Sequence, residues 1–339
     1  MSRNALITLI LILLFSGLLA AQSASGGSTE QVGTSVANIL KVGVGARSLA
    51  MGGASVADCN DISAMYWNVG ALAAIEKNQI LFHQANWLVD SKIYYLGVGF
   101  NLPSIGTFGL SLHYFTSGEM EETTLQNPDG TGRTFSTYDF VLGLSYSRQI
   151  TNRFSVGLTV KMIEESLDRE KARTVSIDMG SLFVTNFLNN MRIGMSLSNL
   201  GGKMQFRGSD LSVQYSPNSG YPTKITQASL DTDEWELPLY FRFGLATEAY
   251  ENDEMRFTVS GEVMDSRDYI HRFAFGGEFG WKEMVFLRGG YQFNSDEDGF
   301  SVGGGLKFGF DWADIIIDYA YTDLGVFNNT QRFSIIFGF

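Results

Sequence analysis

The stretch TYDFVLGLSYSR, residues 137–148, alternates between two kinds of side chain at nearly every step. Its apolar residues share one face: Tyr138, Phe140, Leu142, Leu144 and Tyr146. The other face carries small or polar residues: Asp139, Gly143, Ser145 and Ser147. A side-chain period of two is the pattern of a β-strand, because successive side chains point to opposite faces. This stretch therefore predicts a strand with an apolar medium on one side and a polar interior on the other.

The same alternation recurs from about Asn78 to the last residue. It predicts strands at 78–87, 91–102, 105–116, 136–149, 153–165, 174–186, 190–199, 238–249, 254–265, 270–281, 284–293, 299–310, 312–322 and 331–339. That makes fourteen, an even number, as in single-chain bacterial outer-membrane barrels. Aromatic residues end many of the apolar sets, as in interfacial girdles. We therefore predict an all-β fold, a transmembrane antiparallel β-barrel of about 14 strands spanning residues 78–339.

The links between these strands differ in length in a regular way. Short links such as LPSI, QITN and YEND alternate with longer ones at 117–135, 166–173 and 200–237. Short turns at one rim and long loops at the other are typical of outer-membrane barrels, whose turns lie in the periplasm. The links therefore favour the same fold as the strands do.

The last predicted strand, RFSIIFGF at 332–339, has a strongly apolar face made of Phe333, Ile335, Phe337 and Phe339. An unpaired backbone N–H or C=O in hydrocarbon costs several kcal/mol, so an open sheet edge is excluded there. We predict that this strand closes the barrel by pairing with the first one. We also expect its aromatic face to act as the signal that the barrel assembly machinery recognises.

Bulk composition and the N-terminus point to the bacterial envelope. The chain has 339 residues, 18% charged, with a formal net charge of −12, which argues against nucleic-acid binding. Arg3, an apolar run at 5–19 and small residues at Ala20 and Ala21 predict a signal peptide at 1–21. We therefore predict export to the bacterial outer membrane. Cys59 is the only cysteine, which excludes an intramolecular disulfide and favours a buried filler role.

Residues 22–77 lack strand periodicity and are rich in Gly and Ala. GVGARSLAMGG, at 43–53, resembles a phosphate-binding glycine loop, but it lacks the Lys-Ser/Thr pair that nucleotide sites of that kind use. A barrel of fourteen strands encloses a lumen wide enough to need filling. We therefore predict that 22–77 forms a hatch that folds into the barrel.

The hatch contains GARSLAMGGASVAD and ISAMYWNVGALA, which resemble the N-terminal motif of the PorV/PorQ family within the FadL-like group. The matching residues are Gly45, Ala46, Arg47, Met51, Gly52, Gly53, Ala54, Tyr66, Trp67, Asn68 and Leu72. Where the family has Pro-Ala after the Asn, this chain has Val69 and Gly70, which is expected to loosen the turn.

The resemblance implies an outer-membrane barrel with an N-terminal hatch. In the PorV branch such a barrel serves type IX secretion and receives cargo proteins that carry a C-terminal signal domain. In the FadL branch it carries hydrophobic small molecules through a lateral opening. We take protein secretion as the first prediction and a FadL-like channel as the alternative. Membrane lipid, the assembly machinery and secreted cargo are the expected partners.

Three further features leave alternatives open. Charged residues occupy the inward face: Arg242, Glu248, Arg256, Glu262, Arg272, Glu278, Arg288 and Lys307. They would form paired ladders, or a charged track for solutes. The loop 200–237 would bind a protein partner, or simply cover the barrel mouth. The Gly-rich stretches 276–280 and 303–305 would mark bends in the wall, or fill space on its inner face.

Enzymatic chemistry is not expected. Two of the three histidines, His83 and His113, fall on the inward face, and His271 begins a strand. None lies in a recognisable hydrolase motif, and no Cys/His cluster suggests zinc. The turn NSDEDG at 294–299 lacks a full calcium ligand set. We therefore predict no catalytic residues, no cofactor and no metal.

Overall fold

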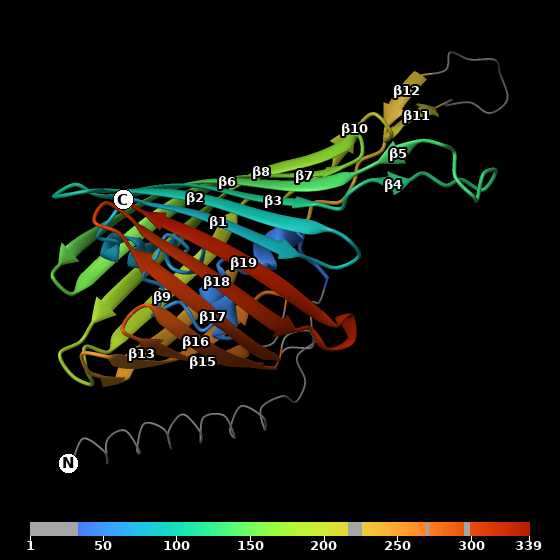
Figure 1. The fold of residues 1–339 in the computed structure, drawn as a ribbon. Helices are drawn as coiled ribbons and strands as arrows, with labels where there is room; N and C mark the ends of the chain where they lie inside the picture. The colour runs from blue at the N-terminus through green and yellow to red at the C-terminus, as the bar shows by residue number, and fades with distance from the viewer. Residues whose placement is uncertain (1–32, 216–225, 269–270, 295–298) are drawn as a thin grey trace, which may run out of the picture.

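In the computed structural model, described for residues 33–215, 226–268, 271–294 and 299–339, the chain forms a closed antiparallel β-barrel (Figure 1). Fourteen long strands make up the wall in this part of the chain. The fold predicted from the alternating pattern is confirmed. The predicted signal peptide, residues 1–21, lies outside the described residues.

The wall strands match the predicted segments to within a few residues. They are β1 (Gln79–Asn86), β2 (Lys92–Leu102), β3 (Gly106–Thr116), β6 (Thr137–Thr151), β7 (Phe154–Leu167), β8 (Glu170–Val184), β9 (Arg192–Gly201), β13 (Tyr240–Glu251), β14 (Met255–Ser266), β15 (Arg272–Trp281), β16 (Val285–Phe293), β17 (Phe300–Gly309), β18 (Asp314–Asp323) and β19 (Asn329–Gly338). Each pairs with its neighbour in sequence, and β1 pairs with β19 to close the wall.

The closing seam aligns the predicted terminal strand with the first one. Phe333 lies opposite Gln84, Ile335 opposite Phe82 and Phe337 opposite Ile80. The N–H of Phe339 donates to the carbonyl of Asn78 at 2.9 Å, and the N–H of Asn78 donates to the carbonyl of Phe339 at 3.1 Å. The prediction that the last strand closes the barrel is confirmed. Its role as an assembly signal stays a prediction.

The two rims of the barrel differ, as the link lengths predicted. At one rim, the turn end, β2 and β3 are joined by three residues and β6 and β7 by two. At the other, the loop end, long segments carry short strands that extend beyond the wall (Figure 1): β4 (Met120–Glu121), β5 (Thr134–Phe135), β10 (Arg207–Gly208), β11 (Ser212–Tyr215) and β12 (Thr226–Ser229).

One predicted loop is wrong. Residues 166–173 do not form a long link, because β7 and β8 continue past the other strands to a turn at Asp168 and Arg169. Cross-strand ion pairs hold this extension: Glu164 accepts from Arg173 at 2.6 Å and from Lys171 at 3.1 Å. Glu164 and its partners break the apolar alternation, so the sequence pattern ended the strand too early.

The outer surface is apolar over the middle of the wall. Alternate residues such as Leu144 and Leu287 are about three-fifths exposed, at 62% and 61%, and their inward neighbours are buried or small. An exposed apolar band of this kind fits a bilayer and not water. Among the described residues, no helix is long and apolar enough to cross a membrane.

Short helices before β1 lie inside the barrel, where Figure 1 shows them surrounded by strands. They are η1 (Asn38–Lys41), α2 (Ala46–Ala50), α3 (Ala64–Trp67) and η2 (Val69–Ala74). Helix α2 contacts β16, β17, β18 and β19, and η2 contacts β6, β7 and β8. We call the described residues 33–77 the hatch.

Candidate functional site

The hatch fills the lumen by direct contact with the wall. Its apolar residues, among them Val44, Ile62 and Leu72, form one buried cluster with inward wall residues such as Leu81 and Ile336. Backbone polar groups also find wall partners, because Ser147 and Ser155 both donate to the carbonyl of Gly70, at 3.2 and 2.7 Å. The hatch is thus packed as a protein core is, and the Gly70 carbonyl finds its hydrogen-bond donors in the wall.

Glycines in the wall make room for the hatch backbone. A Cβ on Gly290 would lie 2.1 Å from the Met51 carbonyl carbon, and one on Gly276 would lie 2.5 Å from the Met51 carbonyl oxygen. We call the wall glycines with such contacts seat glycines: Gly157, Gly180, Gly194, Gly276 and Gly290. Pairing across β15, β16 and β17 shows no register shift, so the bends considered at 276–280 and 303–305 are not found. Gly276 and Gly303 in these stretches instead lie where the hatch approaches the wall closely.

Residues of the resembled motif take part in several of the hatch's contacts. Gly45, Gly52 and Gly53 have φ of 83°, 67° and 81°, a region that favours glycine. The N–H of Ala46 donates to Ser334 Oγ at 3.1 Å. Met51 lies against the seat glycines of β15 and β16.

The aromatic part of the motif is held by side-chain hydrogen bonds. Trp67 Nε1 donates to the backbone carbonyl of Val44 at 2.7 Å, and the Tyr66 hydroxyl donates to the backbone carbonyl of Leu40 at 3.0 Å. Asn68 Nδ2 donates to the carbonyls of Val56 and Ser181. These residues position the hatch, which gives a structural reason for the motif.

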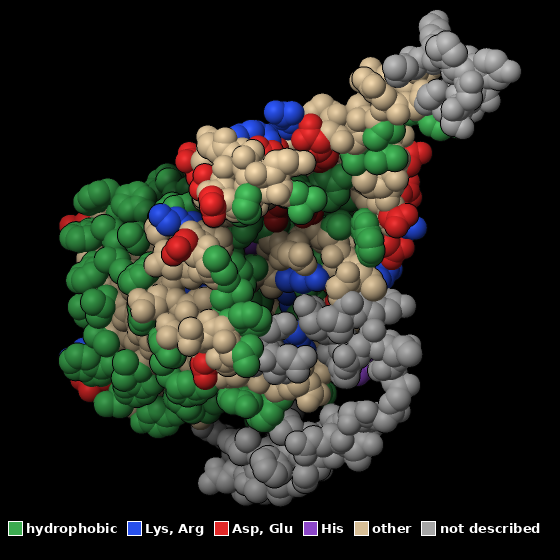
Figure 2. Space-filling model, turned by 90° about the vertical axis from the view of Figure 1, so that its right-hand side faces the viewer, with side chains coloured by type: hydrophobic (Ala, Val, Ile, Leu, Met, Phe, Trp, Pro, Cys, Tyr) green, Lys and Arg blue, Asp and Glu red, His purple; other side chains and the backbone are tan. Residues whose placement is uncertain are grey.

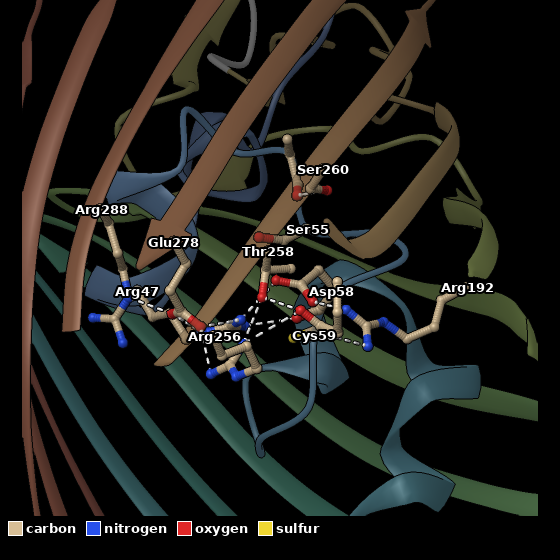
Figure 3. A network of polar contacts seen from close by, with 12 residues as sticks. Arg47, Ser55, Asp58, Cys59, Arg192, Arg256, Thr258, Ser260, Glu278 and Arg288 are labelled. Carbon is tan, nitrogen blue, oxygen red and sulfur yellow. Dashed lines mark hydrogen bonds and ion pairs between the residues drawn. The ribbon is translucent and has the colours of Figure 1, made fainter. Parts of the chain in front are cut away.

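A network of buried charges joins the hatch to the wall near the turn end (Figure 3). Arg47 Nη2 lies 2.6 Å from Asp58 Oδ2 and Arg47 Nε lies 2.9 Å from Glu278 Oε2. Glu278 also accepts from Arg288 at 2.6 Å and from Arg256 at 3.0 Å. One carboxylate on β15 thus holds three guanidinium groups, one of them from the hatch.

The network continues in both directions around the wall. Arg288 reaches Asp318 at 2.5 Å, and Arg192 reaches both Asp58 at 2.5 Å and Glu248 at 2.8 Å. The predicted paired ladder of wall charges is therefore present. The sequence pattern did not predict a contact for Asp58. The residue stood out only because it lies in the acidic stretch of the motif. Removing one partner of a buried ion pair destabilises the folded state by about 3–5 kcal/mol. Opening the hatch would break such pairs, so this network holds the hatch firmly.

Burial also sets the protonation of hatch groups. The pKa of the Cys59 thiol is raised well above its usual range, chiefly because burial removes water, with the nearby Asp61 carboxylate adding to the effect. The pKa of the Tyr66 phenol is raised for the same first reason. Burial alone would lower the pKa of Arg47, but the carboxylates of Asp58 and Glu278 outweigh it and raise that pKa.

On the other side of the hatch, a cavity of about 90 Å³ lies between the hatch and the loop end. Hatch residues, among them Gly53 and Trp67, line one side of it. Its wall residues come from the loop ends of their strands, such as Tyr240 at the start of β13 and Ser301 near the start of β17. Trp87, just beyond β1, lies at the same level. The cavity is therefore on the side of the hatch that faces the long loops.

Cationic and aromatic side chains line this cavity together. Arg242 lies over three rings, with its guanidinium carbon 4.9 Å from the centroid of Tyr240, 5.4 Å from Trp67 and 5.7 Å from Tyr66. Arg332 lies 5.4 Å from the ring of Trp87 in the same way. Figure 2, which views the loop end, shows Lys and Arg side chains inside the hollow of the rim.

Part of the hatch also reaches the loop end. Residues 35–41, the mouth segment, pair with the long loop: the N–H of Val36 donates to the carbonyl of Glu236 at 3.1 Å. Lys41 pairs with Asp268 at 2.8 Å, and the N–H of Ala37 donates to Glu165 at 3.0 Å. The loop 200–237 thus covers this side of the mouth, the simpler of its two interpretations. Binding of a protein partner by this loop stays a prediction.

Two of the three histidines are buried and one is exposed. His83 and His113 are buried in the inner wall, one on each side of Tyr95 in the aligned strands β1, β2 and β3. His271 pairs with Asp265 at 2.9 Å on the surface. Within the described ranges, no group of three or more metal-ligating residues is found. Most of NSDEDG lies outside the described residues.

No protein-family model matches the chain, and no curated protein matches it. Solved structures do. The Pseudomonas putida toluene transporter TodX aligns with a TM-score of 0.55 and 14% identity over 87% of this chain and 96% of that one. The Ralstonia pickettii toluene transporter TbuX aligns at 0.53 and 12% identity, over 87% and 97%.

A Pseudomonas aeruginosa FadL homologue gives a TM-score of 0.50 and 13% identity, over 87% of this chain and 98% of that one. All three are described as transporters or as a FadL homologue, and none as a secretion component. The resemblance to PorV/PorQ is therefore not confirmed by any of them. Because identity is low, the likeness establishes architecture alone: this chain has the fold of the FadL-like barrels along most of its length.

Proposed function

We propose that the protein is an outer-membrane channel that admits small hydrophobic, chiefly aromatic, compounds into the cavity above the hatch. Three features support this function together. The outer wall is apolar, the lumen is closed by a firmly held hatch, and a ring-lined cavity lies on the loop side. The aligned structures named above include two toluene transporters, which favours this alternative over the secretion role predicted first.

The cavity is the observation that carries the proposal. Tyr66, Trp67, Trp87 and Tyr240 give it four aromatic rings, and it lies where a compound arriving from the loop end would meet the hatch. A concave site lined by aromatic side chains with a few fixed polar groups is typical of small-molecule binding. By contrast, the described residues on the turn-end side of the hatch include a network of paired charges.

Uptake measurements test this function. We expect cells that produce the protein to accumulate radiolabelled toluene faster than cells without it. Ala274 lines the cavity and is buried, so Ala274→Phe fills the cavity and is expected to abolish the gain. Ala249 is exposed at the bulge near the turn end of β13, away from the cavity, so Ala249→Phe is the matched control and should transport normally. Equal uptake with and without the protein would rule out the channel function.

Protein secretion now rests on sequence resemblance only. The long loop has its own hairpin of β11 and β12, which extends away from the barrel, but no finding connects it with cargo. Membrane lipid and the assembly machinery remain the expected partners of a barrel of this kind. A secretion role would require that deletion of residues 203–233 stop the export of signal-domain cargo.

A further inference from the structure

Two acidic side chains face each other beside the mouth segment. Asp139 on β6 and Glu165 on β7 lie directly opposite in the strand register, and Asp139 is only 8% exposed. Glu165 accepts a hydrogen bond from the N–H of Ala37 at 3.0 Å. Asp139 accepts one from the N–H of Ile39. Opposed residues of neighbouring strands have Cβ atoms about 5 Å apart, so two like charges meet here on the backbone of the mouth segment.

The surroundings of this carboxylate pair are mainly apolar. A buried cluster beside it combines residues of the mouth segment, the inner wall and the long loop: Ala37, Ile39, Leu40, Val141, Ile163, Ala172, Met204 and Leu237. His113, the next inward residue of β3, lies deeper and opposite Val141. Described charged groups on the packed elements form pairs of their own: Lys41 with Asp268, Lys171 and Arg173 with Glu164, Lys161 with Asp178, and Lys203 and Arg267 with Glu236. The main charge that Asp139 meets is therefore that of Glu165.

The pair lies beyond the apolar band of the wall. One position nearer the band, Glu164 and Arg173 form an ion pair across the outer side of β7 and β8. Burial, and then the neighbouring Glu165 carboxylate, raise the pKa of Asp139 to about 7. Burial also raises the pKa of Glu165. Below neutral pH the two groups therefore hold a proton between them, as closely opposed carboxylates do.

The mouth segment is both strained and part of the cavity lining. Ala37 has a φ of 55°, a left-handed conformation that disfavours residues other than glycine. The segment ends at Lys41, which lines the cavity together with the next two residues, Val42 and Gly43. A cavity of about 90 Å³ is smaller than the roughly 150 Å³ at which an engineered apolar cavity binds benzene. An aromatic compound therefore enters only if part of this lining moves.

We infer that Asp139 and Glu165 form a proton-dependent clasp, which holds the mouth segment over the cavity when they share a proton and releases it when both are ionised. The role of the clasp as a gate rests on the proposed channel function, whereas the clasp itself does not. Because the pKa of each carboxyl is higher when the segment is docked than in water, protons stabilise docking. This stabilisation is complete below the solvent pKa of about 4 and is lost as pH rises to about 7. The mouth is thus closed in acid and opens as pH rises.

Electron paramagnetic resonance of the purified protein in detergent tests the clasp without any substrate. Asn38 is an exposed residue of the mouth segment, so a nitroxide on Asn38→Cys, in a Cys59→Ala background, reports whether the segment is docked. A carboxyl with a pKa of about 7 when docked and about 4 when released changes the ratio of released to docked segment roughly 80-fold between pH 5 and pH 8. We expect the ratio of mobile to immobile label to rise at least about tenfold over this range. A smaller rise, or none, would overturn the inference.

Variants identify the groups that form the clasp. Asp139→Asn removes the charge but keeps an oxygen for the N–H of Ile39, so the label should stay as immobile at pH 8 as at pH 5. Glu165→Gln should have the same effect. Asp168→Asn makes the same change at the turn between β7 and β8, where Asp168 pairs with Arg133, and serves as the matched control that releases the segment as the wild type does. Heat-modifiable migration on a gel shows in each variant that the barrel is folded. An immobile label at pH 8 in Asp168→Asn would mean a general charge effect and would contradict the clasp.

The clasp and the channel fail in different ways. Release of the label with rising pH, without any toluene uptake, would refute the channel and leave the clasp standing. Toluene uptake with a label that does not respond to pH would refute the clasp and leave the channel. At pH 8 we expect cells with Asp139→Asn to take up toluene at least about tenfold more slowly than cells with Asp168→Asn, because fewer molecules have an open mouth. Equal rates would refute the role of the clasp as a gate.

Discussion

The close approach of Gly290 to the hatch predicts that a single added methyl group will loosen it. A Cβ at this position would lie 2.1 Å from the Met51 carbonyl carbon and 2.2 Å from the Gly52 nitrogen, so backbone must move. Overpacking of this kind costs about 1–3 kcal/mol. If the barrel itself stays folded, this cost falls on the hatch. The fraction of molecules with an open hatch should then rise roughly 5- to 150-fold in Gly290→Ala.

Cys59 reports this opening directly. It is the only cysteine of the chain, it is 3% exposed, and its sulfur lies 3.2 Å from Ser63 Oγ. A maleimide reagent should therefore label it only in molecules whose hatch has opened. We expect labelling of Gly290→Ala to be faster by the same roughly 5- to 150-fold factor, because labelling follows the open fraction when the hatch recloses quickly.

Gly289 provides the matched control. It is adjacent in β16 but faces outward, and a Cβ there would meet only the Ser301 carbonyl oxygen at 4.0 Å. Gly289→Ala should label as slowly as the wild type. Heat-modifiable migration on a gel shows in each case that the barrel is folded. If Gly290→Ala labelled no faster than Gly289→Ala, the hatch backbone would not be seated on this glycine and the account of the seat glycines would be wrong.

Other perturbations give graded results. Glu278→Gln removes the carboxylate shared by three arginines at a cost of about 3–5 kcal/mol, so Cys59 should label at least roughly 100-fold faster. Lys77→Ala breaks an exposed pair worth less than about 1 kcal/mol, so its effect should stay below roughly fivefold. The pKa of the Cys59 thiol is raised in the folded state, so above the unfolded-state pKa of about 8.5 the thiol ionises only when the hatch is open. The stability of the closed hatch is therefore unaffected by this group below that pH and falls as pH rises above it. Hatch resistance to protease should therefore decline above about pH 8.5 in the wild type and not in Cys59→Ala. Phe339→Ser keeps the backbone bonds to Asn78, so we expect normal folding in detergent but slower assembly in cells; equal assembly would contradict the signal role.

The sequence was sufficient for the wall because the wall obeys one local rule. Inward and outward positions alternate with a period of two, so the face of the wall on which Leu144 or Ser145 lies can be predicted without knowing which strands lie beside it. The rule failed at Glu164, where an ion pair across β7 and β8 replaced the apolar alternation. Strand ends are therefore less predictable than strands.

The site could be predicted only in part, because it depends on contacts between distant segments. Alternation placed Arg242 and Arg272 on the inner face, but it could not bring them together with Arg332 and Trp87. Depth in a barrel depends on strand tilt and stagger, which a period of two does not encode. Gly276 was likewise placed inward, yet its partner, Met51, lies 225 positions earlier in the chain, so a bend and a seat could not be distinguished.

Gly70 reverses one expectation drawn from the resemblance. Its replacement of the family's Ala was expected to loosen the turn, but the N–H of Gly70 donates to Asn68 Oδ1 at 3.0 Å, which caps η2. A Cβ at Gly70 would lie 2.6 Å from the Cα of Ser181. An alanine there would hold η2 away from β8, so glycine permits a closer fit and not a looser one. A hatch whose helices α2 and η2 both lie this close to the wall favours a lumen that stays closed.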